Sequence, residues 1–168
     1  MKRLARWLWR LLLLVGLAAA ALVAAGQAGL LQGTAPTSLG VRDGRLQPPS
    51  ARPNSVSSQA ALWPDHPQAR DAAIAPLPLQ PGGGPATMAR LQALVQATPG
   101  ARIVQAEPGY LRAEFTSRWL GFVDDAEFWL DPAAGVVQVR SASRLGRRDL
   151  GVNRARIERL RAALATSG

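Results

Sequence analysis

Hydrophobic residues form one long block near the N-terminus of this chain and, after residue 85, several short alternating segments. Residues 11–25 carry no polar side chain, and residues 26–31 continue the block with only Gln27 as a polar position. A helix needs about 20 mainly apolar residues to cross the hydrocarbon core of a bilayer. The pattern therefore predicts an N-terminal membrane helix within residues 1–31.

The residues before this block are basic, with no acidic residue among them. The positive-inside rule places such a cluster in the cytoplasm. We therefore expect a single-pass protein of a bacterial inner membrane, with Trp7 and Trp9 at the headgroup level and the C-terminal domain in the periplasm. A cleavable signal peptide is the alternative, because the small residues at 23–25 or 26–28 could serve as a cleavage site. The domain would then be free in the periplasm.

Residues 32–59 are rich in Pro, Gly, Ser and Thr and show no sustained periodicity. This composition is typical of an extended tether or of an irregular wrap over a domain. Residues 60–84 are similar, and the turn residues of 81–84 precede the first regular pattern. We therefore divide the chain into a membrane anchor or signal peptide (1–31), a tether with a polar signature (32–59) and a periplasmic domain (60–168).

Regular structure is predicted from Pro85 onward. Helical spacing of apolar residues predicts a helix over 86–98, and the stripe Val152, Ile157, Leu160 and Leu164 predicts a final helix that 149–151 lead into and that runs to about 165. Alternation between turn signals predicts strands over 101–107, 110–118, 122–130 and 136–143. Short connections make neighbouring strands antiparallel. The predicted fold is α+β: a four-stranded antiparallel sheet with two helices on one face and the other face open to water.

Charge and composition narrow the function. The net charge is +9, and Lys2, Arg3, Arg6 and Arg10 account for four of these charges, which leaves +5 elsewhere. The remaining arginines alternate with acids, so we do not expect nucleic-acid binding. The absence of cysteine excludes a disulfide, a thiolate metal site and a cysteine nucleophile. His66 is the only histidine, so we expect no metal and no cofactor.

Several separate motifs carry a family resemblance. They are residues 40–46 (GVRDGRL), 53–59 (PNSVSSQ), 121–128 (GFVDDAEF), 139–144 (VRSASR) and 149–154 (DLGVNR). In this order they resemble the family called domain of unknown function number 1499. The resemblance implies an envelope or membrane-associated protein and supplies no reaction. The family usually has cysteine where this chain has Ser55, and often another shortly before it, so a function that needed the thiol would be lost here.

Three acidic residues mark the third predicted strand. Side chains alternate across a sheet, so Asp125 and Glu127 share one face, whereas Asp124 lies on the core face. Two carboxylates on one face could share a proton or hold a divalent cation. We favour a simpler interpretation, in which these acids pair with arginines.

A sharper hypothesis is an anion site. The hairpin over 131–135 should place the fourth strand beside the acids, with a cluster of polar and basic residues leading to the final helix, whose N-terminal N–H groups favour an anion. Arg154 in the first turn would oppose the helix dipole unless an anion offset it. The candidate residues are Asp124, Asp125, Glu127, Arg140, Ser141, Ser143, Arg144, Asn153 and Arg154.

A second polar cluster consists of Asn54, Ser57, Ser58 and Gln59. These side chains either complete a pocket or, as we favour, bond to backbone groups in turns. Trp119 and Trp129 are typical of the core of a small domain. We predict a binding or assembly module for an anionic ligand or an envelope protein partner, with the inner membrane as its support. The alternatives are a small hydrolase that uses Asp125 and Glu127 with the arginine cluster, and a structural subunit of a membrane complex.

Overall fold

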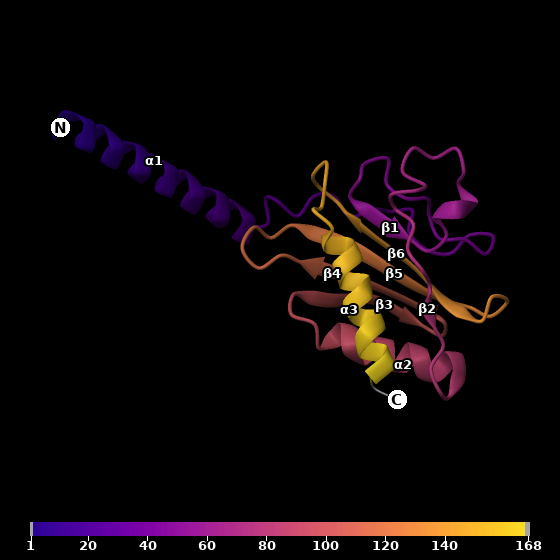
Figure 1. Ribbon diagram of the computed structural model, residues 1–168. Coiled ribbons are helices and arrows are strands. Elements are labelled where there is room, and N and C mark those ends of the chain that lie inside the picture. The colour runs from indigo at the N-terminus through magenta and orange to yellow at the C-terminus, as the bar shows by residue number, and fades with distance from the viewer. Residues whose placement is uncertain (1, 167–168) are drawn as a thin grey trace.

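The chain forms a long N-terminal helix that projects from an α+β domain (Figure 1). The structure is a computed structural model and describes residues 2–166. Helix α1 (Lys2–Gln27) has 26 residues, which corresponds to a length of about 39 Å at about 1.5 Å per residue. Residues 2–22 are exposed along its whole circumference. By length and composition, α1 can cross a membrane.

The domain is built on one antiparallel sheet. Its strands are β1 (Ser55–Ser57), β2 (Leu77–Pro78), β3 (Ala101–Glu107), β4 (Tyr110–Thr116), β5 (Val123–Asp131) and β6 (Val136–Ser143). They lie in the order β1-β6-β5-β4-β3, and β2 pairs with β6 beside β1. The four long strands confirm the predicted ones to within two residues at each end.

The predicted number of strands is wrong, because the sheet has six. The two additional strands are two and three residues long, and both lie on the outer edge of β6. β1 has only the three residues Ser55, Val56 and Ser57, too few for an alternation of apolar and polar residues to be recognised. Its partner is β6, which follows more than 80 residues later, so no local pattern could reveal the pairing.

Helices α2 (Gly83–Gln96) and α3 (Val152–Thr166) lie on the same face of the sheet, which we call the helix face (Figure 1). The core lies between these helices and the sheet. A short 3₁₀ helix, η1 (Ala60–Leu62), lies in the loop between β1 and β2. Val152 departs from the predicted buried stripe of α3, because it is exposed at the start of the helix. The core side chains are Val56, Leu77, Met88, Leu91, Val95, Leu111, Ala113, Phe115, Ala126, Phe128, Val137, Val139, Ile157, Leu160 and Leu164.

The opposite face of the sheet is not open to water as predicted. Residues 40–50 cross it, and we call it the wrapped face. Leu46 is fully buried there, and its N–H donates to the side chain of Gln59 at 2.8 Å. The N–H of Gly40 donates to Glu127 on β5 at 2.7 Å. Glu127, and Arg140 through the carbonyl of Pro48, therefore bond to the wrapping segment in place of water.

Candidate functional site

The wrapped face carries a buried network of acids and arginines. Arg144, just after β6, donates to both carboxylate oxygens of Asp125, at 2.7 and 2.9 Å, and to Glu114 on β4 at 2.5 Å. Arg112 donates to Asp125 at 3.2 Å, and Arg102 donates to Glu114 at 2.6 Å. Such fork-shaped contacts with carboxylates are directional, so the network fixes β4, β5 and the end of β6 relative to one another.

These contacts shift pKa values in a consistent direction. Burial would raise the pKa of Glu114, but hydrogen bonds from Arg144 and Arg102 outweigh it and hold the pKa below its usual value. The hydrogen bond to Asp125 raises the pKa of Arg144 above its usual value. The carboxylate of Glu114 therefore stays ionised, and each acid of this network is matched by a guanidinium.

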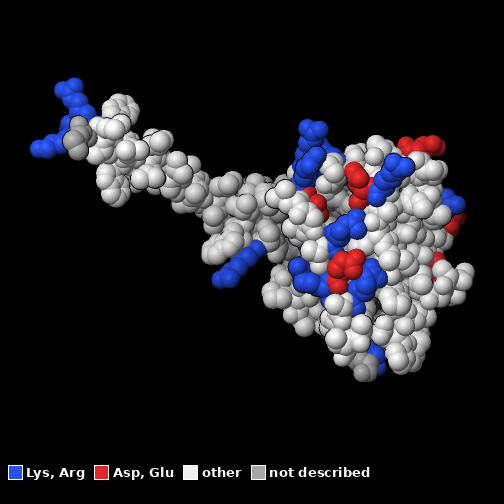
Figure 2. Space-filling view, in the orientation of Figure 1, with Lys and Arg blue, Asp and Glu red and all other residues white. Residues whose placement is uncertain are grey.

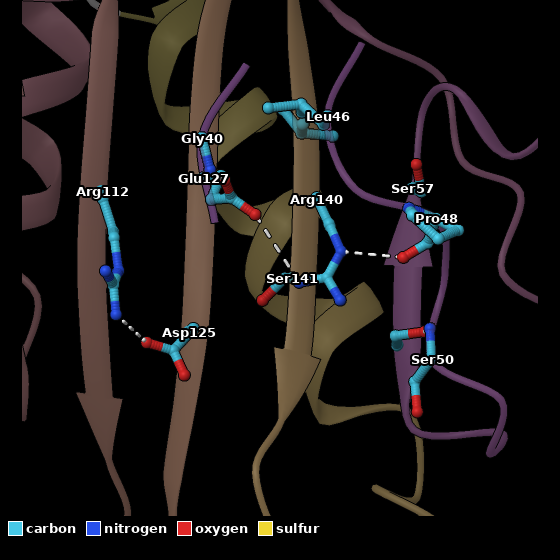
Figure 3. A network of polar contacts seen from close by, with 12 residues as sticks. Gly40, Leu46, Pro48, Ser50, Ser57, Arg112, Asp125, Glu127, Arg140 and Ser141 are labelled. Atoms are coloured by element: carbon cyan, nitrogen blue, oxygen red, sulfur yellow. Dashed lines mark hydrogen bonds and ion pairs between the residues drawn. The ribbon is translucent and has the colours of Figure 1, made fainter. Parts of the chain in front are cut away.

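A second pair on this face lies under the wrapping segment (Figure 3). Glu127 is 0% exposed and accepts hydrogen bonds from the Gly40 N–H at 2.7 Å and the Tyr110 hydroxyl at 2.8 Å. Arg140 donates to the carbonyl of Pro48 at 3.1 Å and faces Glu127 across 3.6 Å, which is longer than a hydrogen bond. Burial lowers the pKa of Arg140, although Glu127 acts to raise it. Burial and the contact with Glu127 raise the pKa of Tyr110.

A separate network lies on the helix face. Arg156 of α3 donates to Asp124 at 2.5 Å, to Asn153 at 2.6 Å and to Ser141 at 3.1 Å. Asn153 also accepts from Ser141 at 2.5 Å and donates to Ser143 at 3.0 Å. The sequence thus placed Asp124 on the correct face, but its partner is Arg156, which lies one turn beyond Asn153 on α3.

The N-terminus of α3 is occupied by a carboxylate of the chain itself. Asp149 accepts from the N–H groups of Gly151 at 3.1 Å and Asn153 at 2.9 Å, so it caps the helix. Burial would raise the pKa of Asp149, but these bonds lower it below its usual value. The predicted convergence is therefore incomplete: Ser141, Ser143 and Asn153 meet near this end, whereas two predicted arginines are absent from it.

Those two arginines lie elsewhere because of how their elements are oriented. Arg144 alternates to the wrapped face, next to Asp125. Arg154 instead reaches the loop between η1 and β2, where it donates to the carbonyls of Asp71 and Ala73 at 2.9 Å each. Arg154 thus holds that loop against α3.

The second polar cluster binds backbone groups around β1. Asn54 donates to the carbonyl of Gly146 at 3.0 Å. Ser58 accepts from the N–H of Val139 at 2.8 Å, and Gln59 donates to the carbonyl of Gly44 at 3.2 Å. The buried hydroxyl of Ser57 accepts from the N–H of Gln59 at 3.2 Å.

A cavity of about 740 Å³ opens at the end of the sheet where α2 ends and α3 begins. Its walls come from the C-terminal end of α2, the β4–β5 loop, the β6–α3 loop and the first turns of α3. Asp124 and Arg156 line it together with Ser143, so the helix-face network borders the cavity. The apolar lining residues are Leu94, Ala97, Pro99, Phe115, Phe122, Leu145, Leu150, Val152, Leu160 and Ala163.

Sequence reasoning missed this cavity and five polar residues of the two faces, which are Arg102, Tyr110, Arg112, Glu114 and Arg156. Arg156 could have been found from its spacing, because it follows Asn153 by three positions and so shares its side of α3. Tyr110 and Glu114 alternate with apolar residues on β4 and therefore point to the face of Asp125.

Among residues 2–166, no three acidic or histidine side chains gather as metal ligands. The histidine ring of His66 accepts from the N–H of Gln68 at 3.1 Å.

The fold and this geometry define a small α+β protein with an N-terminal apolar helix and a cavity at the end of its sheet nearest that helix. The family model described as "Protein of unknown function (DUF1499)" matches residues 45–164. The chain therefore belongs to this family. Neither a curated protein nor a solved structure matches it.

Proposed function

We propose that this protein is a membrane-anchored binding module whose cavity takes an amphiphilic ligand with an apolar chain and an anionic group. The cavity between α2, α3 and the sheet carries the proposal. A ligand site of about 300–1,000 Å³, mainly apolar with a few polar groups, is typical of small-molecule binding. This cavity lies within that range.

The walls of the cavity fit an apolar chain. Leu94 and Leu160 line it from the two helices, and Phe115 and Phe122 line it from the β4 end and the β4–β5 loop. Burying a methylene group of a ligand gains about 0.8 kcal/mol. A chain of several methylenes would therefore account for useful affinity without any reaction.

The charged residues at the cavity favour an anionic group. Arg148, Arg156 and Arg159 line it against Asp124 and Asp149, an excess of one positive charge. Arg156 is held by Asp124, whereas Arg148 and Arg159 form no ion pair with any residue between 2 and 166. These two arginines are placed to meet a carboxylate or phosphate at the cavity's edge.

The proposed location follows from α1. Its basic leader would remain in the cytoplasm, so the domain would lie in the periplasm of a bacterium, joined to the inner membrane by α1. The hydrolase alternative has less support. Asp125 is 1% and Glu127 0% exposed, and neither lines this cavity or the larger one of about 1130 Å³ beside α2.

The test is binding of dansyl-labelled undecanoic acid to the full chain held in an amphipathic polymer without detergent. Ala97→Trp places a large side chain into the cavity, whereas Ala93→Trp adds the same group one turn earlier on α2, outside the lining. We expect saturable binding that Ala97→Trp abolishes and Ala93→Trp preserves. Absence of saturable binding, or equal binding by both variants, would overturn the proposal.

A separate experiment tests the preference of the cavity for an anionic group. The variant Arg148→Gln/Arg159→Gln should bind the dansyl acid more weakly and bind a dansyl alcohol of the same chain length equally well. Equal weakening for both probes would indicate a change in the cavity's shape instead of lost charge recognition.

A further inference from the structure

The end of α1 is attached to the β4–β5 loop. The side chain of Gln27 donates to the carbonyls of Arg118 and Trp119 at 3.0 Å each. Gly26 is buried against Leu120 so closely that a Cβ atom there would collide with the Leu120 carbonyl. The loop over 117–122 is therefore held at a fixed level along the axis of α1.

That level coincides with the outer boundary of a bilayer. The uncharged apolar run begins at Leu11, and about 20 residues are needed to cross the hydrocarbon core. A span that starts at Leu11 would reach Leu30, and α1 itself ends at Gln27, so the contact with the loop lies at the outer end of the span. The end of the domain that carries this loop would thus lie at the headgroups.

This end of the domain exposes large apolar side chains. We define the membrane-facing patch as Trp119, Phe122, Leu145, Leu150 and Val152, each of which is at least 39% exposed. Four of them line the rim of the same cavity, so they lie together although they come from two loops and the start of α3. Trp119 is 64% exposed, which corrects the expectation that it lies in the core.

Leu150 is the most exposed member of the patch. This residue is 93% exposed, and its backbone has a φ of 53°. A bulky residue other than glycine rarely adopts this left-handed conformation. The loop thus holds an apolar side chain outward in a strained conformation, which folding alone does not explain, because Leu150 gains no contact in the core.

Basic residues surround the patch. Arg118 stacks over the ring of Trp119 at 5.0 Å, a pair typical of a membrane interface. Arg147 and Arg148 are exposed in the β6–α3 loop, beside Leu145 and Leu150. Figure 2 shows basic side chains on the side of the domain near the end of α1, after a length of α1 that carries no charge. This combination of apolar and cationic groups is complementary to an anionic lipid surface.

We infer that the membrane-facing patch docks on the outer surface of the same bilayer that α1 crosses, at anionic lipid headgroups, so that the cavity opens toward the membrane. This inference rests on the proposed placement of α1 in a membrane. It does not depend on which ligand the cavity binds. α1 and the patch would together hold the domain in one orientation.

The absence of cysteine makes a direct test available, because a single introduced cysteine is labelled alone. Leu150→Cys in the full chain is labelled with the environment-sensitive dye NBD in nanodiscs of phosphatidylcholine and phosphatidylglycerol. Quenching by lipids that carry a spin label near the headgroup reports contact with the membrane. Leu13→Cys in α1 tests the anchor, and Ala134→Cys in the β5–β6 hairpin, at the far end of the sheet in Figure 1, is the matched control.

We expect strong quenching at positions 13 and 150 and none at 134, with weaker quenching at 150 when phosphatidylglycerol is omitted. Quenching at 13 with none at 150 would overturn the docking and leave the anchor intact. Equal quenching at 150 and 134 would also overturn it, because the domain would then lie on its side. No quenching at 13 would overturn both the anchor and the docking. Trp119→Cys repeats the measurement on the second loop, in case the strained position 150 alters its own loop.

Discussion

The arginine network on the wrapped face leads to a quantitative prediction about stability. Arg144→Met keeps the length and the apolar stem of the side chain but removes the guanidinium. It eliminates the two hydrogen bonds to Asp125, at 2.7 and 2.9 Å, and the one to Glu114 at 2.5 Å. The change tests whether this cluster stabilises the fold or is held ready for a ligand.

The expected loss of unfolding free energy depends on the contacts that Asp125 and Glu114 keep in the variant. Arg144 has a side chain that is 7% exposed and Asp125 one that is 1% exposed, so the pair is buried. Removing one partner of a buried ion pair costs about 3–5 kcal/mol. Arg112 still reaches Asp125 at 3.2 Å and Arg102 still reaches Glu114 at 2.6 Å. We therefore expect a loss near the lower end, about 3 kcal/mol, from a domain stability of about 5–15 kcal/mol.

Urea unfolding of the full chain in nanodiscs, followed by tryptophan fluorescence, measures this loss. Arg154→Met is the matched control, because Arg154 bonds only to exposed loop carbonyls at 2.9 Å; it should cost about 1 kcal/mol or less. Arg144→Lys should fall between, since lysine keeps the charge but lacks the planar fork. A loss below about 1 kcal/mol in Arg144→Met, with an unchanged urea dependence, would refute the structural role and make the cluster a ligand site.

Two further predictions concern α3 and α1. Asp149→Ala should lower the free energy of unfolding at pH 7 by about 1 kcal/mol through loss of the cap. Because the folded pKa of Asp149 is lowered, this contribution is present above the usual aspartate pKa and is lost as the pH falls through the folded value. Urea unfolding at pH 3 should therefore show a smaller difference between the variant and the wild type than at pH 7. Gly26→Val should push α1 away from Leu120 and speed tryptic cleavage after Arg118 in nanodiscs, whereas Gly16→Val, which has open space around it, should not; equal cleavage of both variants would contradict the tight contact.

The long strands could be predicted because their signals are local. Alternation in β4 and β5 and the turns at 108–109 and 131–135 lie within a few residues of one another, and pairing between successive strands needs no distant partner. β1 and β2 could not be predicted in this way. They have two or three residues each, and what makes them strands is the free edge of β6.

For the candidate site, the alternation of side chains along a strand predicted only which face of the sheet each residue lies on. The alternation of side chains placed Asp124 on one face of the sheet and Asp125 and Glu127 on the other. The sequence left open which face Arg140 shares, and the register of the hairpin pairs it with Glu127. The rotation of α3 about its axis decides that Arg156, and not Arg154, meets Asp124. Sequence periodicity fixes which residues share a side of a helix, but the packing of the helix decides which side faces the sheet.

The pairing of β1 and β2 with β6 has a consequence for the order in which the molecule is completed. The chain is synthesised from its N-terminus, so the wrapping segment and β1 emerge long before their partners. The hydrogen-bond partner of Gly40 is Glu127, which is synthesised 87 residues later, and the partner of the Pro48 carbonyl is Arg140, which is synthesised 92 residues later. Such distant contacts slow folding. A nascent chain that ends before β6 thus has its N-terminal helix but also unpaired strand edges and a charged sheet face without its cover. The segment that is synthesised early is therefore among the last to reach its final position.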